Sequence, residues 1–365
     1  MITCFAPGRV ELLGNHTDYN EGFVLSVSIP YGVTASGSLL PGGQIRLSTE
    51  FQGNRLEHVA AIDAPFVRRN DWTDYPLGVV HALREAGHVL GGFEVSFSSD
   101  LPPGAGLSSS AAMEVSTVLL LAKLFGFTMS GIEFAKLCRL AENQFVGVQC
   151  GILDQVSSLF GKKDRAVSLD CRSLDVDTIT FPHGVKLLII QSGVPHALVG
   201  GEYNERRERC SAAARALGVP FLRDADSAML AAGNLPEPER RRAAHIIGEN
   251  ERVRETIKLL SRGDVSAVGQ LMSASHESSR VNFENSTPVL DMLVDIAKST
   301  PGVLGARLTG GGFGGAIVVL VERDASHGAG EAIAGEYFRR SGNHAAVLEC
   351  DLSDGALALN GFGII

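Results

Sequence analysis

The sequence predicts a globular protein of two closely packed domains built from strands and helices. A chain of 365 residues is long for one hydrophobic core, so two domains are the expected arrangement. Alternating runs that contain β-branched residues predict strands, and longer apolar runs without glycine or proline predict buried helices. A hydrophobic content of 45% and a charged content of 20% are typical of soluble globular proteins.

The predicted elements follow one another along the whole chain. Strands are expected at residues 2–6, where Pro7 and Gly8 end the pattern, and at residues 24–38, 93–98, 185–191 and 316–321. Helices are expected at residues 77–86, 113–125 and 131–145, and an alanine-rich helix is expected after residue 207. The charged segment 170–177 is the best candidate boundary, which gives domains at residues 1–176 and 177–365.

A segment rich in glycine and serine, residues 102–112, lies between a predicted strand and a predicted helix. Gly104 and Gly106 can take backbone angles closed to other residues and let a ligand approach the main chain. The serines at 108–110 fall where the first N–H groups of a helix have no internal partner. Together with the positive end of a helix dipole these groups form an anion site, so a phosphate site is favoured over simple helix capping.

The densest polar stretch of the chain is residues 8–22. It places hydrogen-bonding side chains of several types among three glycines: Arg9, Glu11, Asn15, His16, Asp18 and Asn20. Such groups suit a hydroxylated ligand, because each buried hydroxyl needs a partner. A polar surface loop explains the composition equally well. A metal site is not expected, because His16 and Asp18 lack a third ligand at a suitable spacing.

One acidic residue, Asp154, lies in an apolar neighbourhood that continues through residues 156–160. Burial of a carboxylate is costly unless the group is paired, and Arg9 is the candidate partner. A carboxylate held in a largely apolar site is a candidate base. Alternatively, Asp154 caps the helix that follows it.

Three further features each have two interpretations. Trp72, the only tryptophan, is either a core residue or a platform for a flat base. His245 and Glu249 are one helical turn apart, and a solvated helix face is favoured over a metal pair. Residues 309–315 match G-x-G-x-x-G, but a predicted strand follows them, so their glycines are expected to pack against a neighbouring backbone or ligand.

Composition excludes several classes of partner. A net charge of −9 and a pI near 5.6 argue against nucleic acid, which requires a basic face. The six cysteines form no C-x-x-C pair, which excludes the common zinc patterns and fits reduced thiols. No signal-peptide pattern and no apolar run of membrane-spanning length occur, so a soluble cytoplasmic protein without a membrane partner is expected.

Several separated segments together resemble the family of small-molecule kinases that includes galactokinase, homoserine kinase, mevalonate kinase and phosphomevalonate kinase. Residues 8–20 are similar to the N-terminal signature of the galactokinases. Residues 102–112 are similar to the phosphate-binding motif of the family, and residues 309–315 to its glycine-rich third motif. Galactokinase segments also resemble residues 150–155, 202–207 and 249–253. Each segment alone is a weak signal, but the set is specific and runs along nearly the whole chain.

The resemblance implies a two-domain α+β kinase fold with the active site in the cleft between the domains. It also implies phosphorylation of the anomeric hydroxyl of galactose by ATP with Mg²⁺. By matched position, Asp154 would orient or deprotonate the acceptor hydroxyl with Arg9 beside it, and Ser110 and Glu142 would hold Mg²⁺. The other implied contacts are Asn15, His16, Asp18, Gly151 and Tyr203 with the sugar, Trp72 with adenine, and Gly104, Gly106, Leu107, Ser108, Ser109 and Ser110 with the phosphates.

The sequence departs from the galactokinase pattern in two places. Asn15 stands where galactokinases usually carry Glu, at the position that contacts the 6-hydroxyl, and Glu11 stands where they usually carry Asn. An amide at position 15 predicts that galactose is accepted with relaxed discrimination at C6. Residues 275–285 lack the acidic and tyrosine residues usual in that segment.

Two alternatives to a galactose kinase remain. One is an anomeric kinase for a C6-modified hexose such as galacturonate, and the other is a non-catalytic sensor of galactose and ATP. The sensor is disfavoured because sensing does not require the set Arg9, Ser110, Glu142 and Asp154. In each case the expected partners are small molecules, and the chain is expected to be a monomer.

Overall fold

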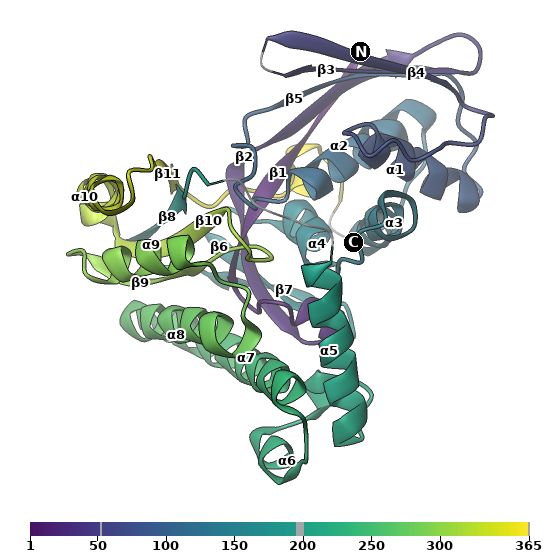
Figure 1. Ribbon diagram of the computed structural model, residues 1–365. Helices are drawn as coiled ribbons and strands as arrows, with labels where there is room; N and C mark the ends of the chain where they lie inside the picture. Colours follow the sequence, from purple (N-terminus) through teal and green to yellow (C-terminus); the bar gives the residue numbers. More distant parts are fainter. Residues whose placement is uncertain (52, 195–200, 364–365) are drawn as a thin grey trace.

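Two β-sheets form the centre of the molecule (Figure 1). The computed structural model describes residues 1–51, 53–194 and 201–363. Within these residues the first sheet has seven strands: β1 (Ile2–Leu13), β2 (Phe23–Leu39), β3 (Gln44–Phe51), β4 (Asn54–Ala61), β5 (Phe93–Ser99), β6 (Arg165–Asp170) and β7 (Val176–Thr180). Their order is β4-β3-β5-β2-β6-β7, and β1 also pairs with β2. Only the β3–β5 pair is parallel among these described strands.

The second sheet contains four of the described strands: β8 (Val185–Gln191), β9 (Val303–Leu308), β10 (Ala316–Glu322) and β11 (Ala346–Cys350). It is antiparallel in the order β11-β8-β10-β9. Successive side chains of a strand point to opposite faces. In β8, Leu188 and Ile190 join a core with α9 and α10, whereas Leu187 and Ile189 join the main core of the molecule. Because both faces are covered, the strand is apolar throughout.

The helices cover these sheets in two groups (Figure 1). The first group lies beside the first sheet and contains α1 (Asp74–Glu85), α2 (Ser109–Phe125), α3 (Gly131–Leu140), the π-helical η2 (Ala141–Val146) and α4 (Leu153–Phe160). The second group comprises α5 (Glu202–Leu217), α6 (Ser227–Ala232), α7 (Glu237–Arg262), α8 (Val265–Ser278), the π-helical η4 (Ser279–Phe283), α9 (Pro288–Lys298) and α10 (Ser326–Ser341). The short α11 (Ala356–Leu359) packs against α4 and β1 of the first half. Short 3₁₀ turns occur at η1 (Asp18–Asn20), η3 (Leu222–Asp224) and η5 (Arg323–Ala325).

One hydrophobic core connects the two halves of the chain. It joins Leu25 of β2 and Leu119 of α2 to Leu187 of β8, Val253 of α7 and Met272 of α8. All five side chains are at most 1% exposed. Any cavity at the boundary of the two halves is therefore held by a continuous packed interior of low compressibility.

The first strand is longer than the sequence predicts. The expectation that Pro7 and Gly8 end it after residue 6 is wrong, because β1 continues to Leu13 through a register shift between Pro7 and Arg9. Proline is tolerated at such irregular positions of a strand that has a partner on one side only. The continuation matters for function, because it carries Arg9 and Glu11 to the boundary between the halves.

The other predicted strands and helices are confirmed with small changes at their ends. The helix predicted at residues 131–145 consists of α3 followed by η2. The predicted boundary after residue 176 falls at the first residue of β7, which still pairs with β6. The strands change sheet between Thr180 and Val185, and the division into two domains stays a prediction.

Candidate active site

A cavity of about 400 Å³ lies between the two halves of the chain. Its walls come from β1 and the turn after it, η2, the start of α4, the start of α5 and the glycine-rich loop after β9. This volume lies within the range of small-molecule sites. Eight residues predicted for catalysis, sugar contact or metal binding line it: Arg9, Asn15, His16, Asp18, Glu142, Gly151, Asp154 and Tyr203.

The carboxylate of Asp154 is held by side chains from two other segments. Arg9 on β1 donates from Nε to Oδ1 at 2.7 Å, and its Nη2 lies 2.7 Å from the same oxygen. The hydroxyl of Ser108 donates to Oδ2 at 2.6 Å. The predicted pairing with Arg9 is therefore present, and the carboxylate is directed at these two side chains although Asp154 lies in the first turn of α4. The Asp154 side chain remains 28% exposed, so one side of it faces the cavity.

The predicted phosphate loop enters α2 through an unusual backbone. Gly106 has φ +68°, and Ser108, the residue before the first turn of α2, has φ 60° and ψ 47°. The left-handed conformation is uncommon for serine and directs its hydroxyl to Asp154. The carbonyl of Gly106 accepts a hydrogen bond from Nη1 of Arg9 at 2.7 Å. Arg9 thus connects the loop to the carboxylate of Asp154.

The glycine-rich loop at residues 309–315 lies against the predicted phosphate loop. A Cβ added to Gly310 would be 3.1 Å from the carbonyl oxygen of Gly106. A Cβ added to Gly312, which has φ +82°, would be 2.2 Å from the carbonyl oxygen of Asn285. The expectation that these glycines allow close backbone packing is confirmed.

A second group of carboxyls lies beside Asp154. Glu142 accepts hydrogen bonds from Nε2 of Gln155 at 2.9 Å, from the thiol of Cys150 at 3.2 Å and from the hydroxyl of Ser110. Burial raises the pKa of Glu142 to about 7, and the charge of Asp154 adds to the rise.

Gln155 extends this group into the interior. Its Nε2 also lies 3.3 Å from Oε2 of Glu114, which is fully buried. Burial raises the pKa of Glu114 well above its ordinary value, and the charge of Glu142 acts in the same direction. Burial therefore favours the neutral form of Glu114, which packs behind the residues of the cavity wall.

The oxygen atoms of Ser110 and Glu142 fit a magnesium ion. Mg²⁺ prefers oxygen ligands and is commonly bound by one or two carboxylates together with phosphates and waters. The neighbouring acidic groups, Glu142 and Asp154, also favour a divalent cation at this place. The described residues contain no group of three or more His, Cys, Asp or Glu that would hold a metal by itself. The fit is therefore to an ion shared with a phosphate ligand.

The predicted sugar-contacting side chains gather in another part of the same cavity wall. His16 donates from Nε2 to the carbonyl oxygen of Gly311 at 3.0 Å, and its Nδ1 accepts from the hydroxyl of Tyr19 at 2.9 Å. Burial lowers the pKa of His16 to about 3, so the ring is neutral. The ring of Tyr203 packs against it, with 5.1 Å between the ring centroids.

Asp18 and Gly151 form a close contact in the same wall. A Cβ added to Gly151 would lie 1.9 Å from Oδ2 of Asp18, so a larger residue would force the Asp18 side chain to shift. Burial raises the pKa of Asp18 to about 7, and the charge of Asp154 acts in the same direction. Asp18 can therefore both donate and accept hydrogen bonds near neutral pH.

Asn15 belongs to a buried polar cluster. Its Nδ2 donates to the carbonyl oxygen of Gly310 at 2.8 Å and lies 3.4 Å from Oε2 of Glu11. Its Oδ1 accepts from Nδ2 of Asn285 at 2.8 Å. Oε1 of Glu11 accepts from Nη1 of Arg307 at 2.8 Å. Burial raises the pKa of Glu11, while the charge of Arg307 opposes this rise.

His245 and Glu249 do not form the solvated helix face that the sequence favours, and that prediction is wrong. Both side chains are fully buried, because α7 packs against β1, β2 and α8. His245 places Nε2 3.1 Å from the carbonyl oxygen of Asn15 and Nδ1 3.0 Å from the hydroxyl of Ser278. Oε1 of Glu249 accepts from the backbone N–H of Gly14 at 3.1 Å. These residues position the turn that carries the predicted sugar-contacting side chains.

Trp72 lies outside the cavity wall. It is half-buried against the main core and meets Phe97 of β5 edge-on, with 6.1 Å between the ring centroids. β5 leads directly into the predicted phosphate loop. The core interpretation is confirmed, and the contact with adenine stays a prediction.

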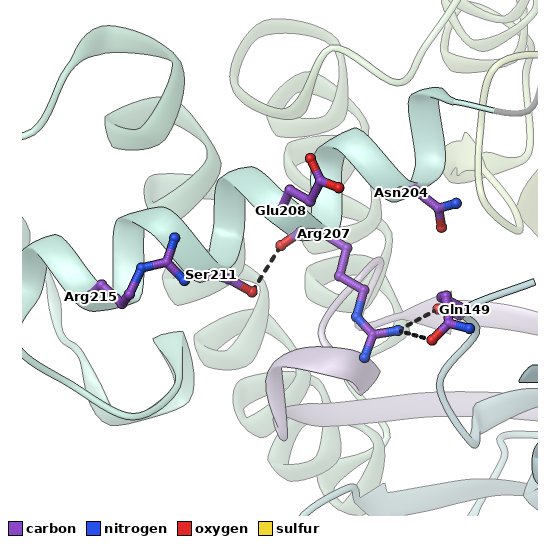
Figure 2. A pocket seen from close by; sticks show the side chains of 6 residues that line it. All are labelled: Gln149, Asn204, Arg207, Glu208, Ser211 and Arg215. Atoms are coloured by element: carbon purple, nitrogen blue, oxygen red, sulfur yellow. Dashed lines mark hydrogen bonds between the residues drawn. The ribbon is translucent and has the colours of Figure 1, made fainter.

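A second hollow, of about 370 Å³, runs along α5 (Figure 2). Figure 2 shows Arg207 reaching the loop before α4, where its Nη1 donates to the backbone oxygen of Gln149 at 3.0 Å. Asn204 lines this hollow and the cavity between the halves. The hollow is lined largely by exposed side chains, so it borders the candidate site without sharing its convergent buried groups.

Some residues of the site were not identified from the sequence. Glu11 was noted only as one of several polar groups, and Glu114 was missed although it is the only charged residue from Ser109 to Ala122. A lone acid in an apolar helix signals a buried carboxyl. Asn285 gave no such signal, because its partner Asn15 is 270 residues away.

Two findings concern the rest of the molecule. All six cysteines are unpaired. No helix within the described residues combines the length and apolar character needed to cross a membrane.

Comparison with known proteins identifies relatives along the whole chain. Residues 2–39 match the galactokinase galactose-binding signature, residues 74–162 match the GHMP kinases N terminal domain, and residues 256–340 match the GHMP kinases C terminal model. The galactokinase of Lactococcus lactis, solved in complex with galactose, is 30% identical, with a TM-score of 0.92 over 97% of this chain and 94% of that chain.

More distant structures share the fold. The mevalonate kinase of Methanococcus jannaschii is 19% identical, with a TM-score of 0.68 over 97% of this chain and 98% of that chain. The homoserine kinase of Cytophaga hutchinsonii is 18% identical, with a TM-score of 0.65 over 97% and 96%.

Proposed function

This chain belongs to the galactokinases within the GHMP kinases, which use ATP to phosphorylate an alcohol, and we propose that it phosphorylates the anomeric hydroxyl of galactose in the cavity between its halves. One observation carries the assignment of the site. Asp154 is held by Arg9 and Ser108 where the predicted phosphate loop meets the cavity wall that carries His16 and Asp18. A nucleophilic hydroxyl and a phosphoryl donor can therefore meet at one carboxylate.

Asp154 orients the acceptor hydroxyl and accepts its proton. The transition state of phosphoryl transfer is usually loose, so positioning contributes more than proton removal. Arg9 pairs with the carboxylate of Asp154 and also offsets negative charge on the transferring group. Because Nη1 of Arg9 binds the carbonyl of Gly106, the same side chain aligns the phosphate loop with the acceptor.

The residues of the loop and of α2 bind the nucleotide. The phosphates lie along the segment Gly104, Gly106, Leu107, Ser108, Ser109 and Ser110, and adenine contacts Trp72. Ser110 and Glu142, together with the phosphates, would hold Mg²⁺, which would supply neutralisation of charge on the donor.

The sugar is bound by the part of the cavity wall that carries His16 and Asp18. Its hydroxyls find partners among Asn15, His16, Asp18 and Tyr203, and it packs against Gly151. The proposal includes a monomeric enzyme. The unpaired cysteines fit a reducing cytoplasm.

The test is a panel of free sugars with ATP and Mg²⁺, followed as ADP release. We expect galactose to give the highest kcat/KM, and we expect activity to disappear with a chelator and to return with added Mg²⁺. Highest activity with galacturonate would replace galactose by a C6-modified sugar. Binding of galactose and ATP without ADP release would support the sensor and contradict the proposal.

A further inference from the structure

We propose that Glu11 determines sugar specificity: its carboxylate accepts a hydrogen bond from a hydroxyl on the side of the sugar away from the anomeric carbon and excludes sugars that carry a carboxylate there. The inference rests on the proposed function, because it assumes a hexose with its anomeric hydroxyl at Asp154. It adds a residue to which the sequence assigned no role in the site, and it predicts discrimination at C6 where Asn15 alone predicts that this discrimination is relaxed.

The position of Glu11 suits this role. Glu11 follows Arg9 by two residues on β1, and residues two apart on a strand share a face. Their side chains leave the strand about 7 Å apart, a separation that one hexose can bridge. Both residues line the cavity, although Glu11 is only 3% exposed. A sugar whose anomeric hydroxyl meets Asp154, the partner of Arg9, therefore reaches toward Glu11 at its other side.

Glu11 also has unused capacity to accept hydrogen bonds. An ionised carboxylate offers about four lone-pair directions. Arg307 occupies one on Oε1, and Asn15 approaches one on Oε2. The amide donors of Asn15 are directed to Gly310 and Glu11, and its oxygen already accepts from Asn285. Glu11 therefore has more unoccupied lone-pair directions than Asn15 for accepting a hydrogen bond from a sugar hydroxyl.

Arg307 favours the charged form of the Glu11 carboxylate and opposes the effect of burial on it. Arg307 is fully buried, and within the described part of the chain its Nε and Nη2 have no hydrogen-bond partner. A buried guanidinium requires a counter-ion, and Glu11 contacts it at 2.8 Å. Arg307 does not line the cavity, so Glu11 stands between a buried cation and the bound sugar. An anionic group on the sugar would face this carboxylate and be repelled.

The contacts of Asn285 explain why an amide at position 15 accompanies a carboxylate at position 11. Asn285 donates from Nδ2 to Asn15 and also lies 3.1 Å from the carbonyl oxygen of Gly311. It therefore fixes the amide of Asn15 with its nitrogen toward Glu11. A second carboxylate at position 15 would lie within hydrogen-bond distance of Glu11 and repel it.

The experiment measures kcat/KM for galactose, its 4-deoxy and 6-deoxy forms, and galacturonate in the wild type and in Glu11→Gln. We expect Glu11→Gln to lower kcat/KM for galactose about tenfold, since a charged acceptor becomes a neutral one. At least one deoxygalactose should lose less than threefold, because it lacks the hydroxyl that Glu11 binds. The ratio of galacturonate to galactose should rise at least tenfold, while KM for ATP stays unchanged.

The exchange variant Glu11→Asn/Asn15→Glu is the control for the case in which Glu11→Gln fails to fold, because the exchange keeps one carboxylate in the cluster. We expect it to fold and to keep galactose ahead of galacturonate, whereas Glu11→Gln narrows that difference. An active wild type whose sugar ranking is unchanged in Glu11→Gln, with only thermal stability lowered, would overturn the inference alone. A wild type that phosphorylates no sugar would overturn the proposed function and the inference together.

Discussion

Asp154 is the residue on which the proposed chemistry depends, and its partners come from segments 145 and 46 positions away in the chain. We expect Asp154→Asn to lower kcat by roughly two to four orders of magnitude, the range of general acid–base and positioning effects. Asparagine keeps the shape and an acceptor for Ser108, so KM for ATP should change little. Steady-state kinetics with galactose and ATP measure both quantities, and turnover near that of the wild type would remove Asp154 from the mechanism.

The partner of a single residue could be predicted where burial makes an unpaired charge too costly. An acid in an apolar segment needs a cation, and this reasoning correctly linked Asp154 to Arg9. The network of Glu11, Asn15 and Asn285 could not be predicted, because it depends on how the loop after η4 is placed against β1. No local pattern encodes a contact between segments so far apart.

At the scale of elements, the loop before α2 stores backbone strain at Ser108. A left-handed conformation costs a residue other than glycine about 1–2 kcal/mol. We expect Ser108→Gly and Ser108→Ala to lose activity alike, because both remove the hydroxyl that binds Asp154. Ser108→Gly should be the more stable of the two by about 1 kcal/mol, because only glycine relieves the strain.

Chemical denaturation of the two Ser108 variants, with kinetics on the same preparations, checks this expectation. Equal stability would show that φ of 60° at this position carries no strain. Full activity in either variant would show that the hydroxyl does not position Asp154.

Element types could be predicted more reliably than their limits or their exposed faces. The strands around the phosphate loop and α2 were found because apolar periodicity is local. The end of β1 was misplaced because proline at a strand irregularity removes no required hydrogen bond. The sequence does not predict the buried face of α7, because that face carries polar residues instead of apolar ones. His245 and Glu249 can be buried there because they form hydrogen bonds with the backbone of the turn after β1.

At the scale of the whole molecule, polar contacts between α7 and the first half should make stability depend on pH. Burial lowers the pKa of His245 from 6.5 to about 4. The unfolded chain therefore binds a proton at His245 that the folded chain does not bind between these pH values. The stabilisation is fully present above pH 6.5 and is lost as the pH falls toward 4, with a total of about 3 kcal/mol for this group.

His245→Gln tests this contribution. We expect the variant to be less stable than the wild type at pH 7.5 and to lose less free energy of unfolding between pH 7 and pH 4.5. His344→Gln is the matched control, because His344 is exposed and should leave the pH profile of the wild type unchanged. Parallel pH profiles of the wild type and His245→Gln would contradict a neutral buried imidazole at this position.

The overall arrangement was predictable in outline. Chain length indicated two domains, and the family resemblance implied an active site in the cleft between them, where the structure has a cavity. The shared hydrophobic core was not predictable, and neither were the contacts of α7 and α8 with β1 of the first half. Each apolar segment can bury its face against many others.

The most direct test of the central claim is phosphorus and proton NMR of the product formed from galactose, ATP and Mg²⁺. The predicted product carries its phosphate on the anomeric oxygen, with phosphorus coupled to the anomeric proton, and its formation should be strongly reduced in Asp154→Asn. A phosphate on any other hydroxyl, or no sugar phosphate from a folded protein that binds both ligands, would contradict the assignment of this cavity to anomeric phosphoryl transfer.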